Sequence, residues 1–278
     1  MLLPLLRHYA VAQTKYRIHS PFVGHWIEEV LEDSRAYYAF DELEGLWERL
    51  KLDERKLAVT DLGAGSRADG ARAAERSVAS IARTAVCRPS KGRFLFRQTL
   101  FSKPTTILEL GTSLGISALY FRAAAPKARL VTVEGCPNIA AVARENFRRM
   151  GGHPPESYVG NFDDVLPGLL PQLGQLDLLY LDGNHREAPT LRYFELCLPY
   201  VGENSVFLLD DIHWSAEMQR AWQQLSAHPS VSLSIDTFHT GLLFFKKEIS
   251  GKKHFVLTPW YCKPWQSGFL TARSGVKE

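Results

Sequence analysis

Four short segments of this 278-residue chain place glycines or acidic side chains where they could bind a ligand or act on one. In the first segment, Glu109 stands two positions before Gly111, and Gly115 follows in the same stretch. Glycines in such a turn let a ligand approach the backbone, and a helix that starts after them offers free N–H groups. The pattern predicts a ligand-binding loop that comprises Glu109, Gly111, Thr112, Ser113, Gly115 and Ser117.

Two further segments could complete a nucleoside site. Glu134 follows Glu109 by 25 positions and ends the next apolar run. A carboxylate at that place can accept hydrogen bonds from two ribose hydroxyls. Asn161 and Phe162 follow Gly160, and they could flank an adenine with a polar group and a ring.

The spacing of the glycines indicates which nucleoside cofactor to expect. A dinucleotide-binding loop has the pattern GxGxxG, whereas three residues separate Gly111 from Gly115 in this chain. Glu109 would repel a pyrophosphate but attract an ammonium group, directly or through water. S-adenosylmethionine is a nucleoside with a cationic amino-acid tail. The pattern therefore indicates this cofactor and disfavours a nucleotide-dependent oxidoreductase.

The remaining acidic residues indicate a site for catalysis. Asp182 follows the apolar run 176–181, and Asp210 and Asp211 follow the run 205–209. Three carboxylates at neighbouring strand ends would repel one another, and a divalent cation such as Mg²⁺ would remove that conflict because it prefers oxygen ligands. Such an ion could also lower the pKa of an acceptor hydroxyl and orient it. We therefore predict a metal site formed by Asp182, Asp210 and Asp211.

A general base completes this prediction. His185 stands three positions after Asp182, and a histidine with its ordinary pKa of about 6.5 can accept a proton at neutral pH. Methyl transfer from a sulfonium needs alignment and a deprotonated acceptor, but no covalent nucleophile. We assign His185 and Asp182 to catalysis, and we also count Asp182 among the residues that bind the cofactor. Alternatives stay open, since Asp182 and Asp210 can cap helices and His185 can be structural; His213 and Trp214 either shape the acceptor pocket or pack.

An alternation of strands and helices must position these segments. Short apolar runs predict strands, and the amphipathic stretches between them predict helices. This alternation is typical of an α/β protein whose parallel sheet is covered on both faces and binds ligands at the carboxyl ends of its strands. The expected strands are 106–110, 130–134, 158–159, 176–181, 205–209, 231–235 and 242–245, and the expected helices are 37–50, 117–124, 138–150, 187–200 and 216–225.

Residues 93–247 resemble the class I S-adenosylmethionine-dependent methyltransferases. The resemblance rests on the stretch 107–117, with Glu134 downstream of it. It implies a Rossmann-like methyltransferase fold, with a mostly parallel seven-stranded sheet and helices on both faces. It also implies that the glycine loop wraps the methionine part of the cofactor and that Glu134 binds the ribose.

The acidic part resembles the cation-dependent O-methyltransferases of the catechol and antibiotic-sugar type. Asp182, Asp210 and Asp211 match the positions of their metal ligands. The catechol type has a lysine base where this chain has His185, which puts a catechol substrate in doubt more than the role of the base. Small-molecule enzymes with an Asp-Gly-x-His stretch are more similar. Residues 19–22 and 95–97 are similar to a bacterial branch of the methyltransferases, which implies no particular substrate.

The rest of the chain is interpreted as extensions of this domain. We divide the chain into a mainly helical N-terminal extension (1–100), the S-adenosylmethionine-binding domain (101–249) and a C-terminal tail (250–278) that packs on the core. Ser20 and Pro21 predict a helix start, with Ser20 as the cap. Methyltransferase specificity usually lies in such added segments.

Two N-terminal segments keep two interpretations each. The glycine turn 61–66 is either a plain turn or part of a lid over the substrate. The arginine-rich stretch 67–97 is either a solvated helix face or a surface for an acidic substrate.

Composition and charge limit the class of protein. Hydrophobic residues make up 45% and charged residues 23%, which excludes a disordered or fibrous chain. The net charge of +3 is too small to argue for nucleic acid as the main partner. The four cysteines form no CxxC pair, and the N-terminal apolar run is too short for a membrane span or a signal peptide. We expect a cytoplasmic protein without a membrane partner, and we leave a homodimer open.

The expected function is O-methylation of a hydroxyl on a small-molecule acceptor, with help from a divalent cation. Two alternatives are a methyltransferase that acts on RNA or protein and a non-catalytic S-adenosylmethionine-binding protein. Methyltransferases of nucleobase amino groups often carry a Pro-Pro-aromatic motif after the fourth strand, and cytosine-carbon methylation needs a Pro-Cys nucleophile. This chain has neither at the required place, so an oxygen acceptor is favoured and a nitrogen acceptor stays open.

Overall fold

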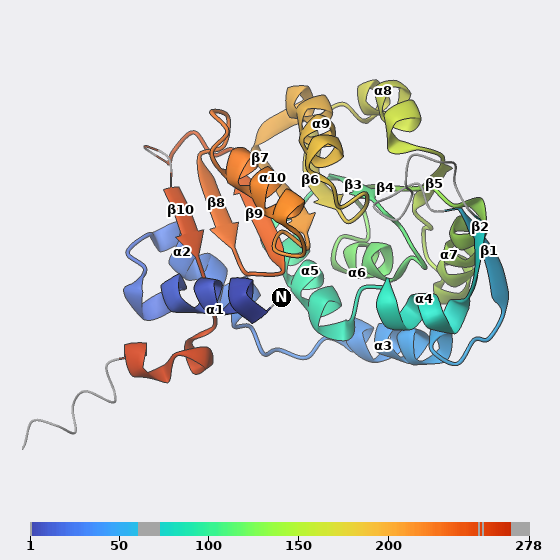
Figure 1. Cartoon of the computed structure of the whole chain (residues 1–278), viewed down its shortest axis with the longest axis horizontal. Coiled ribbons are helices and arrows are strands. Elements are labelled where there is room, and N and C mark those ends of the chain that lie inside the picture. Colours follow the sequence, from blue (N-terminus) through green and yellow to red (C-terminus); the bar gives the residue numbers. More distant parts are fainter. Residues whose placement is uncertain (1, 61–72, 250, 252, 268–278) are drawn as a thin grey trace, which may run out of the picture.

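A central sheet organises the molecule (Figure 1). The computed structural model describes residues 2–60, 73–249, 251 and 253–267, so the predicted glycine turn 61–66 lies outside the described residues. The strand order is β10-β8-β9-β7-β6-β3-β4-β5. Strand β9 is antiparallel to β7 and β8, and the other neighbouring pairs are parallel. The strands are β3 (Thr106–Leu110), β4 (Arg129–Glu134), β5 (Glu156–Val159), β6 (Leu176–Leu181), β7 (Val201–Asp210), β8 (Leu233–Asp236), β9 (Thr240–Phe244) and β10 (Lys253–Val256).

This sheet confirms the predicted Rossmann-like α/β fold and corrects one detail of it. All seven expected strands are present, and their limits lie within four residues of the predicted ones. The described part of the sheet has an eighth strand, β10, which pairs in parallel with β8 at the sheet edge. The prediction missed it because the segment 253–256 is short and polar at its start, and only its neighbour β8 makes it a strand.

The register of the sheet aligns the predicted site residues. Leu110 of β3 pairs with both Val133 of β4 and Leu181 of β6, and Leu181 also neighbours Leu209 of β7. The residue that follows each of these four lies at the same carboxyl edge. Those residues are Gly111, Glu134, Asp182 and Asp210.

Strand side chains alternate between the two faces of the sheet, and each face has its own hydrophobic core. Ile107 and Leu178 belong to the core beneath α6 and α7, whereas Leu108 and Leu179 belong to the core beneath α8, α9 and α10. Figure 1 shows these two groups of helices on opposite sides of the sheet. The helices are α6 (Ile116–Ala124), α7 (Pro137–Met150), α8 (Phe162–Leu173), α9 (Glu187–Cys197) and α10 (Ala216–Ser226).

The helix predictions hold with two differences. The predicted helix 187–200 ends at Cys197 and continues as the 3₁₀ turn Leu198–Tyr200. Helix α8 was not expected, and it contains Pro167 and Pro171 in its interior. Because proline is disfavoured inside helices, the sequence of this segment hides a helix that packing on the sheet stabilises.

The N-terminal part of the chain covers the α6 and α7 face. Trp26 and Leu95 are fully buried in the same core as Ile107, and the Trp26 indole donates a 2.7 Å hydrogen bond to Gln98. The elements are α1 (Leu2–Val11), the 3₁₀ turn Lys15–Arg17, α2 (Pro21–Trp26), a π-helical turn (Ile27–Leu31), α3 (Tyr38–Leu50), β1 (Lys56–Thr60), β2 (Ala73–Ser77), α4 (Val78–Thr84) and α5 (Pro89–Ser102).

Two features of this part bear on the sequence analysis. Ser20 caps α2 as predicted, because its hydroxyl accepts the backbone N–H of Val23. The antiparallel pair β1 and β2 was not expected, since the segment was interpreted as helices and loops. Asn138 of α7 donates a 2.7 Å hydrogen bond to the Ala58 carbonyl, which ties β1 to the sheet domain.

The two ends of the described chain lie side by side near β10 (Figure 1). The Lys263 ammonium is buried and donates to the carbonyl oxygens of Ala10 and Ala12, at 3.4 Å and 2.7 Å. These carbonyls end α1 and would otherwise lack partners. The short 3₁₀ turns Trp260–Cys262 and Pro264–Ser267 complete the described tail. Across the described residues, the helices are too short or too polar to span a membrane.

Candidate active site

A cavity of about 1200 Å³ opens at the carboxyl edge of the sheet. The ends of β3, β4, β6 and β7 form one wall, and the N-terminal part of the chain forms the other. Ligand pockets are commonly about 300–1,000 Å³, so this cavity has room for a cofactor and an acceptor together. The predicted site residues that line it are Gly111, Ser113, Glu134, Asn161, Phe162, Asp182, His185, Asp210 and Asp211.

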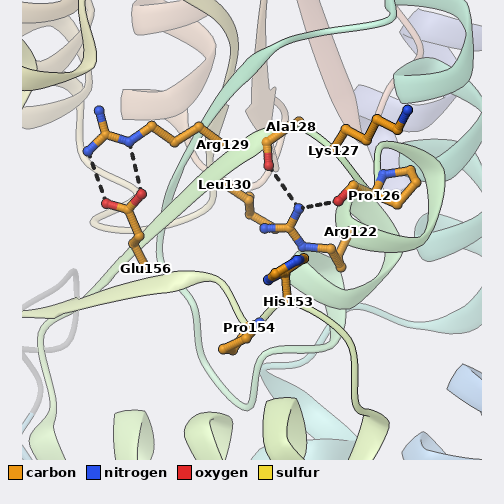
Figure 2. Close-up of a pocket in the computed structure, with 9 residues that line it drawn as sticks. All are labelled: Arg122, Pro126, Lys127, Ala128, Arg129, Leu130, His153, Pro154 and Glu156. Atoms are coloured by element: carbon orange, nitrogen blue, oxygen red, sulfur yellow. Dashed lines mark hydrogen bonds and ion pairs between the residues drawn. The ribbon is translucent and has the colours of Figure 1, made fainter.

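A second, smaller pocket of about 400 Å³ lies at the amino ends of β4 and β5 (Figure 2). Figure 2 shows that its polar groups mostly contact one another: Arg122 donates to the carbonyls of Pro126 and Ala128, and Arg129 pairs with Glu156. None of the predicted site residues lines it. Because ligands of open α/β sheets bind at the carboxyl edge, the large cavity is the candidate active site.

Glu134 is held at the cavity wall by backbone groups. One carboxylate oxygen accepts the N–H of Ser113 and the other accepts the N–H of Cys136, both at 2.9 Å. The carboxylate is thereby fixed in orientation, as binding of a ribose through two hydroxyls requires.

The glycine loop approaches the neighbouring strand closely. Gly111 has φ +104°, and a Cβ atom there would lie 2.2 Å from the Asp182 carbonyl oxygen. A side chain at this position is excluded both by the backbone angle and by the contact. The absence of a side chain lets the loop after β3 pack directly against the end of β6. Gly111, Ser113 and the oriented Glu134 carboxylate line the cavity, and this set of groups fits S-adenosylmethionine.

Four of the predicted cofactor residues lie behind this wall and do not line the cavity. Glu109 is fully buried, and its two oxygens accept hydrogen bonds from Ser117 at 2.5 Å and Thr132 at 2.7 Å. Burial raises the pKa of Glu109 to about 7, although both hydroxyls oppose the shift. Thr112 is buried against Thr132. In this structure these residues brace the loop, and direct binding of a ligand by Glu109, Thr112 or Ser117 stays a prediction.

Gly115 is the fourth of these residues, and its role in the structure is packing. It has φ +85°, and a Cβ atom there would lie 2.5 Å from the Phe147 ring. The glycine therefore lets α6 begin directly against α7. On the cavity side, the Phe162 ring lies edge-on to Tyr193 with centroids 5.5 Å apart, and Asn161 caps α8 by accepting the N–H of Asp163.

Two aspartates meet where β6 and β7 end. The Tyr180 hydroxyl donates to Asp182 at 3.0 Å, and the Thr240 hydroxyl lies 3.4 Å from Asp210, which is 1% exposed. Burial, and then the charge of Asp210, raise the pKa of Asp182 well above its usual range. Asp211 follows with φ +53° and also lines the cavity; burial followed by the Asp210 charge raises its pKa as well. Negative charge is therefore costly in this cluster, and a nearby counter-ion would stabilise it.

The structure supplies that counter-ion from the N-terminal part of the chain. Lys91, in the first turn of α5, forms an ion pair and hydrogen bond with Asp210. Burial opposes the charge of this ammonium, but Asp210 and Asp182 more than compensate, so the pKa of Lys91 is raised above its ordinary value. Lys91 also lines the cavity. A fixed positive charge thus lies where the sequence predicted a metal ion.

The predicted metal ligands can be tested against this arrangement. Within the described residues, no group of three or more His, Cys, Asp or Glu side chains is arranged to hold a metal ion. Two like unit charges 4 Å apart repel by about 4 kcal/mol in a protein of effective dielectric constant 20, and a divalent ion next to Lys91 would meet roughly twice that repulsion. As placed, Asp182, Asp210 and Asp211 do not fit a divalent cation.

The predicted base is close to the acidic pair. His185 Nε2 lies 3.7 Å from an Asp182 oxygen, and its ring stacks on Trp214 with centroids 6.3 Å apart. Both side chains line the cavity. His213 does not: its Nε2 lies 2.8 Å from Asp236, a carboxylate that His8 of α1 also contacts. His213 therefore packs, whereas Trp214 shapes the pocket.

The far wall of the cavity is apolar and aromatic. Leu31 and Phe94 come from the N-terminal helices, and Pro259 and Tyr261 come from the C-terminal tail. The two extensions therefore contribute to the lining of the cavity together with the sheet.

Sequence reasoning missed Lys91 and His239, which both line the site. Lys91 lies 119 positions before Asp210, in a stretch whose many arginines suggested a solvated face. The one usable signal was Gly92 beside it, a glycine inside a helical stretch, which the Tyr120 ring requires because a Cβ atom would lie 2.1 Å from that ring.

Comparison with known proteins agrees with this geometry. Residues 108–212 match a family described as a methyltransferase domain, a segment that runs from the glycine loop to just beyond Asp211. A catechol O-methyltransferase from Niastella koreensis is 31% identical over 158 residues, which are 55% of this chain and 70% of that protein. A transmembrane O-methyltransferase from Homo sapiens is 42% identical over 113 residues, which are 39% of this chain and 38% of that protein.

A solved structure extends the likeness to the fold. The methyltransferase PaMTH1 from Podospora anserina, bound to SAH, superposes with a TM-score of 0.55, covering 81% of this chain and 94% of that chain at 19% identity. The fold, the glycine loop at Gly111 and the relatives all indicate the same family. The chain belongs to the class I S-adenosylmethionine-dependent O-methyltransferases.

Proposed function

We propose that this enzyme methylates a hydroxyl of a small molecule held between the aspartate pair and the aromatic wall. The observation that carries the proposal is that Glu134 and His185 line one cavity. A nucleoside gripped at Glu134 would then share an enclosed space with an acceptor beside a base. The apolar residues Leu31, Phe94 and Tyr261 favour an acceptor with an apolar or aromatic body.

The side chains divide the work of the reaction. When bound, S-adenosylmethionine supplies an electrophilic methyl group, whose carbon–sulfur bonding pair stays on sulfur as the new carbon–oxygen bond forms. His185 accepts the proton of the acceptor hydroxyl and passes it to solvent. Asp182, 3.7 Å from the His185 ring, orients that ring. The aromatic wall excludes water and aligns the acceptor for in-line attack.

The proposed reaction needs no divalent cation, since Asp210 is paired with Lys91 and Asp182 accepts a hydrogen bond from the Tyr180 hydroxyl. A macromolecular acceptor is disfavoured by the arginines near the cavity. Arg93 forms two hydrogen bonds with Glu44, at 2.7 Å and 2.8 Å, and Arg97 lies 3.5 Å from Asp33. These cations are therefore partly neutralised within the protein, which favours a small-molecule acceptor over RNA.

A binding and turnover experiment tests the proposal. We expect calorimetry to show binding of S-adenosylmethionine and none of NAD, and at least one member of a panel of phenols and sugars to yield S-adenosylhomocysteine. His185→Gln should lower kcat about 100-fold at neutral pH without changing cofactor affinity. His153→Gln, an exposed histidine beside the smaller pocket, is the matched control. Binding of NAD alone, or full turnover by His185→Gln, would contradict the assignment.

A further inference from the structure

We propose that the Lys91 ammonium takes the place of a divalent cation at the acceptor site, so that methyl transfer by this enzyme needs no metal. The inference rests on the proposed function, because it names the group that would stabilise the acceptor oxygen. In the proposal Lys91 does two things. It neutralises the buried pair Asp182 and Asp210, and it presents a positive charge to the acceptor oxygen as His185 removes the proton.

The position of the ammonium carries the first part of the proposal. Asp210 is 1% exposed, and the Lys91 side chain is 25% exposed, so the lysine lies between the carboxylate and the open cavity. An ammonium has three N–H donors, and Asp210 is its one hydrogen-bond partner among the described residues. Lys91 lines the cavity, so an acceptor oxygen bound there can accept a hydrogen bond from one of its remaining N–H groups.

The packing of α5 carries the second part, because it fixes the lysine before any ligand binds. Gly92, the next residue, is buried, and a Cβ atom there would lie 2.1 Å from the Tyr120 ring. Leu95, one turn further along α5, is fully buried in the core. The backbone of Lys91 is therefore held against α6, and its charge is preorganised rather than recruited from solution. Preorganised charge is what stabilises a developing oxyanion most effectively.

The geometry also separates the roles of Lys91 and His185. His185 approaches Asp182 from the loop after β6, whereas Lys91 reaches Asp210 from α5. His185 and Lys91 thus contact the two neighbouring carboxylates from different elements. One accepts the acceptor proton and the other holds the resulting negative charge, a division that leaves no task for a bound metal.

The first test measures whether methyl transfer by the natural protein depends on a metal ion. We expect methyl transfer to change by less than twofold when EDTA is added or when Mg²⁺ is supplied, and titration calorimetry with Mg²⁺ alone to show no binding. Loss of activity in EDTA that Mg²⁺ restores would overturn the proposal, and so would calorimetric binding of Mg²⁺ by the natural protein. The calorimetric arm needs no acceptor, so it decides whether the site binds Mg²⁺ even if no tested hydroxyl is methylated.

The second test replaces the charged side chain of Lys91 with a neutral one or with another cation. Lys91→Met should lower kcat about 100-fold while leaving the affinity for S-adenosylmethionine within twofold, and the unneutralised aspartates should now bind Mg²⁺ in calorimetry. Lys91→Arg should recover part of the lost kcat because it restores a cation. Lys56→Met, which removes an exposed lysine paired with Glu75, is the matched control and should behave as the natural protein.

The outcomes of the exchange are distinguishable. Full activity of Lys91→Met would overturn the proposal, because the charge would then be dispensable. Equal losses in Lys91→Met and Lys91→Arg, with no gain of Mg²⁺ binding, would also overturn it and assign Lys91 a purely structural role. Should Lys91→Met fail to fold in a thermal melt, Lys91→Arg and the Mg²⁺ titration of the natural protein still decide the question.

Discussion

The two halves of the cavity are built in different ways. The cofactor half comprises Gly111, Ser113 and Glu134, which lie within 24 residues of one another. The Ser113 N–H donates to the Glu134 carboxylate, and the Gly111 N–H donates to the Val133 carbonyl. The acceptor half joins Asp210 of the sheet to Lys91 of an N-terminal helix, 119 positions away. In the proposed site, a local segment would fix where the nucleoside binds, whereas packing between distant segments would fix the surroundings of the acceptor.

This difference suggests how the halves can vary. The cofactor half depends on strand register and on one glycine turn, both of which tolerate little change. The acceptor half depends on how α5 and the C-terminal tail pack on the domain. A change in that packing could therefore alter the charge at the acceptor end without moving Gly111 or Glu134.

The largest expected effect comes from Gly111, the residue at which the cofactor half contacts the backbone of Asp182. Gly111→Ala places a Cβ atom 2.2 Å from the Asp182 carbonyl at a φ of +104°. Left-handed strain and overpacking together should destabilise the fold by roughly 3–4 kcal/mol, measured by urea unfolding, and should abolish cofactor binding. Gly168→Ala is the control: this helical glycine has open space around its Cβ position, so unfolding should be unchanged or slightly harder. A stable, cofactor-binding Gly111→Ala protein would refute the close approach of β3 and β6.

The next effect tests whether Glu109 braces the cofactor half. Its pKa of about 7 in the folded protein exceeds the ordinary value of about 4.3, so the folded state favours the protonated carboxyl. Stability should therefore fall as pH rises from about 4 to 7, by up to ~3.7 kcal/mol, and level off above pH 7. Glu109→Gln should remove this dependence.

The measurement for Glu109 is urea unfolding between pH 4.5 and 8.5. The difference in unfolding free energy between Glu109→Gln and the natural protein should grow in favour of the variant up to about pH 7 and then stay constant. Glu145→Gln, an exposed carboxylate on α7, is the control and should follow the natural protein. Parallel pH profiles for Glu109→Gln and the natural protein would show that Glu109 does not titrate with folding.

The smallest expected effect comes from Glu134, whose substitution should change the cofactor half of the cavity alone. Glu134→Gln keeps the size of the side chain but weakens the hydrogen bonds it can accept from ribose hydroxyls and from the Ser113 N–H. We expect the Kd for S-adenosylmethionine to rise about 10-fold, or about 1.4 kcal/mol, with kcat at saturating cofactor unchanged. Glu156→Gln, at the opposite edge of the sheet, is the control. A fall in kcat with an unchanged Kd would place Glu134 in the acceptor half instead.

The amino-acid sequence by itself determined the architecture and the row of residues at its edge. Strand and helix periodicity is a local property, so β3 and β6 were predicted residue for residue, and each predicted acid stands at a strand end that the register then aligns. The glycine loop and Glu134 lie in one contiguous stretch, so their proximity follows from the chain's own strand–helix–strand pattern.

Only the tertiary structure decided the charge balance of the acceptor site and the burial of the loop acid. The sequence placed Glu109 as a ligand-binding group, but packing of α6 on the sheet buries it against Ser117 and Thr132. The sequence predicted a cation beside three aspartates, and the fold places Lys91 there from 119 positions away. Burial and long-range ion pairing depend on how all the elements pack together, and no local pattern of residue types contains that information.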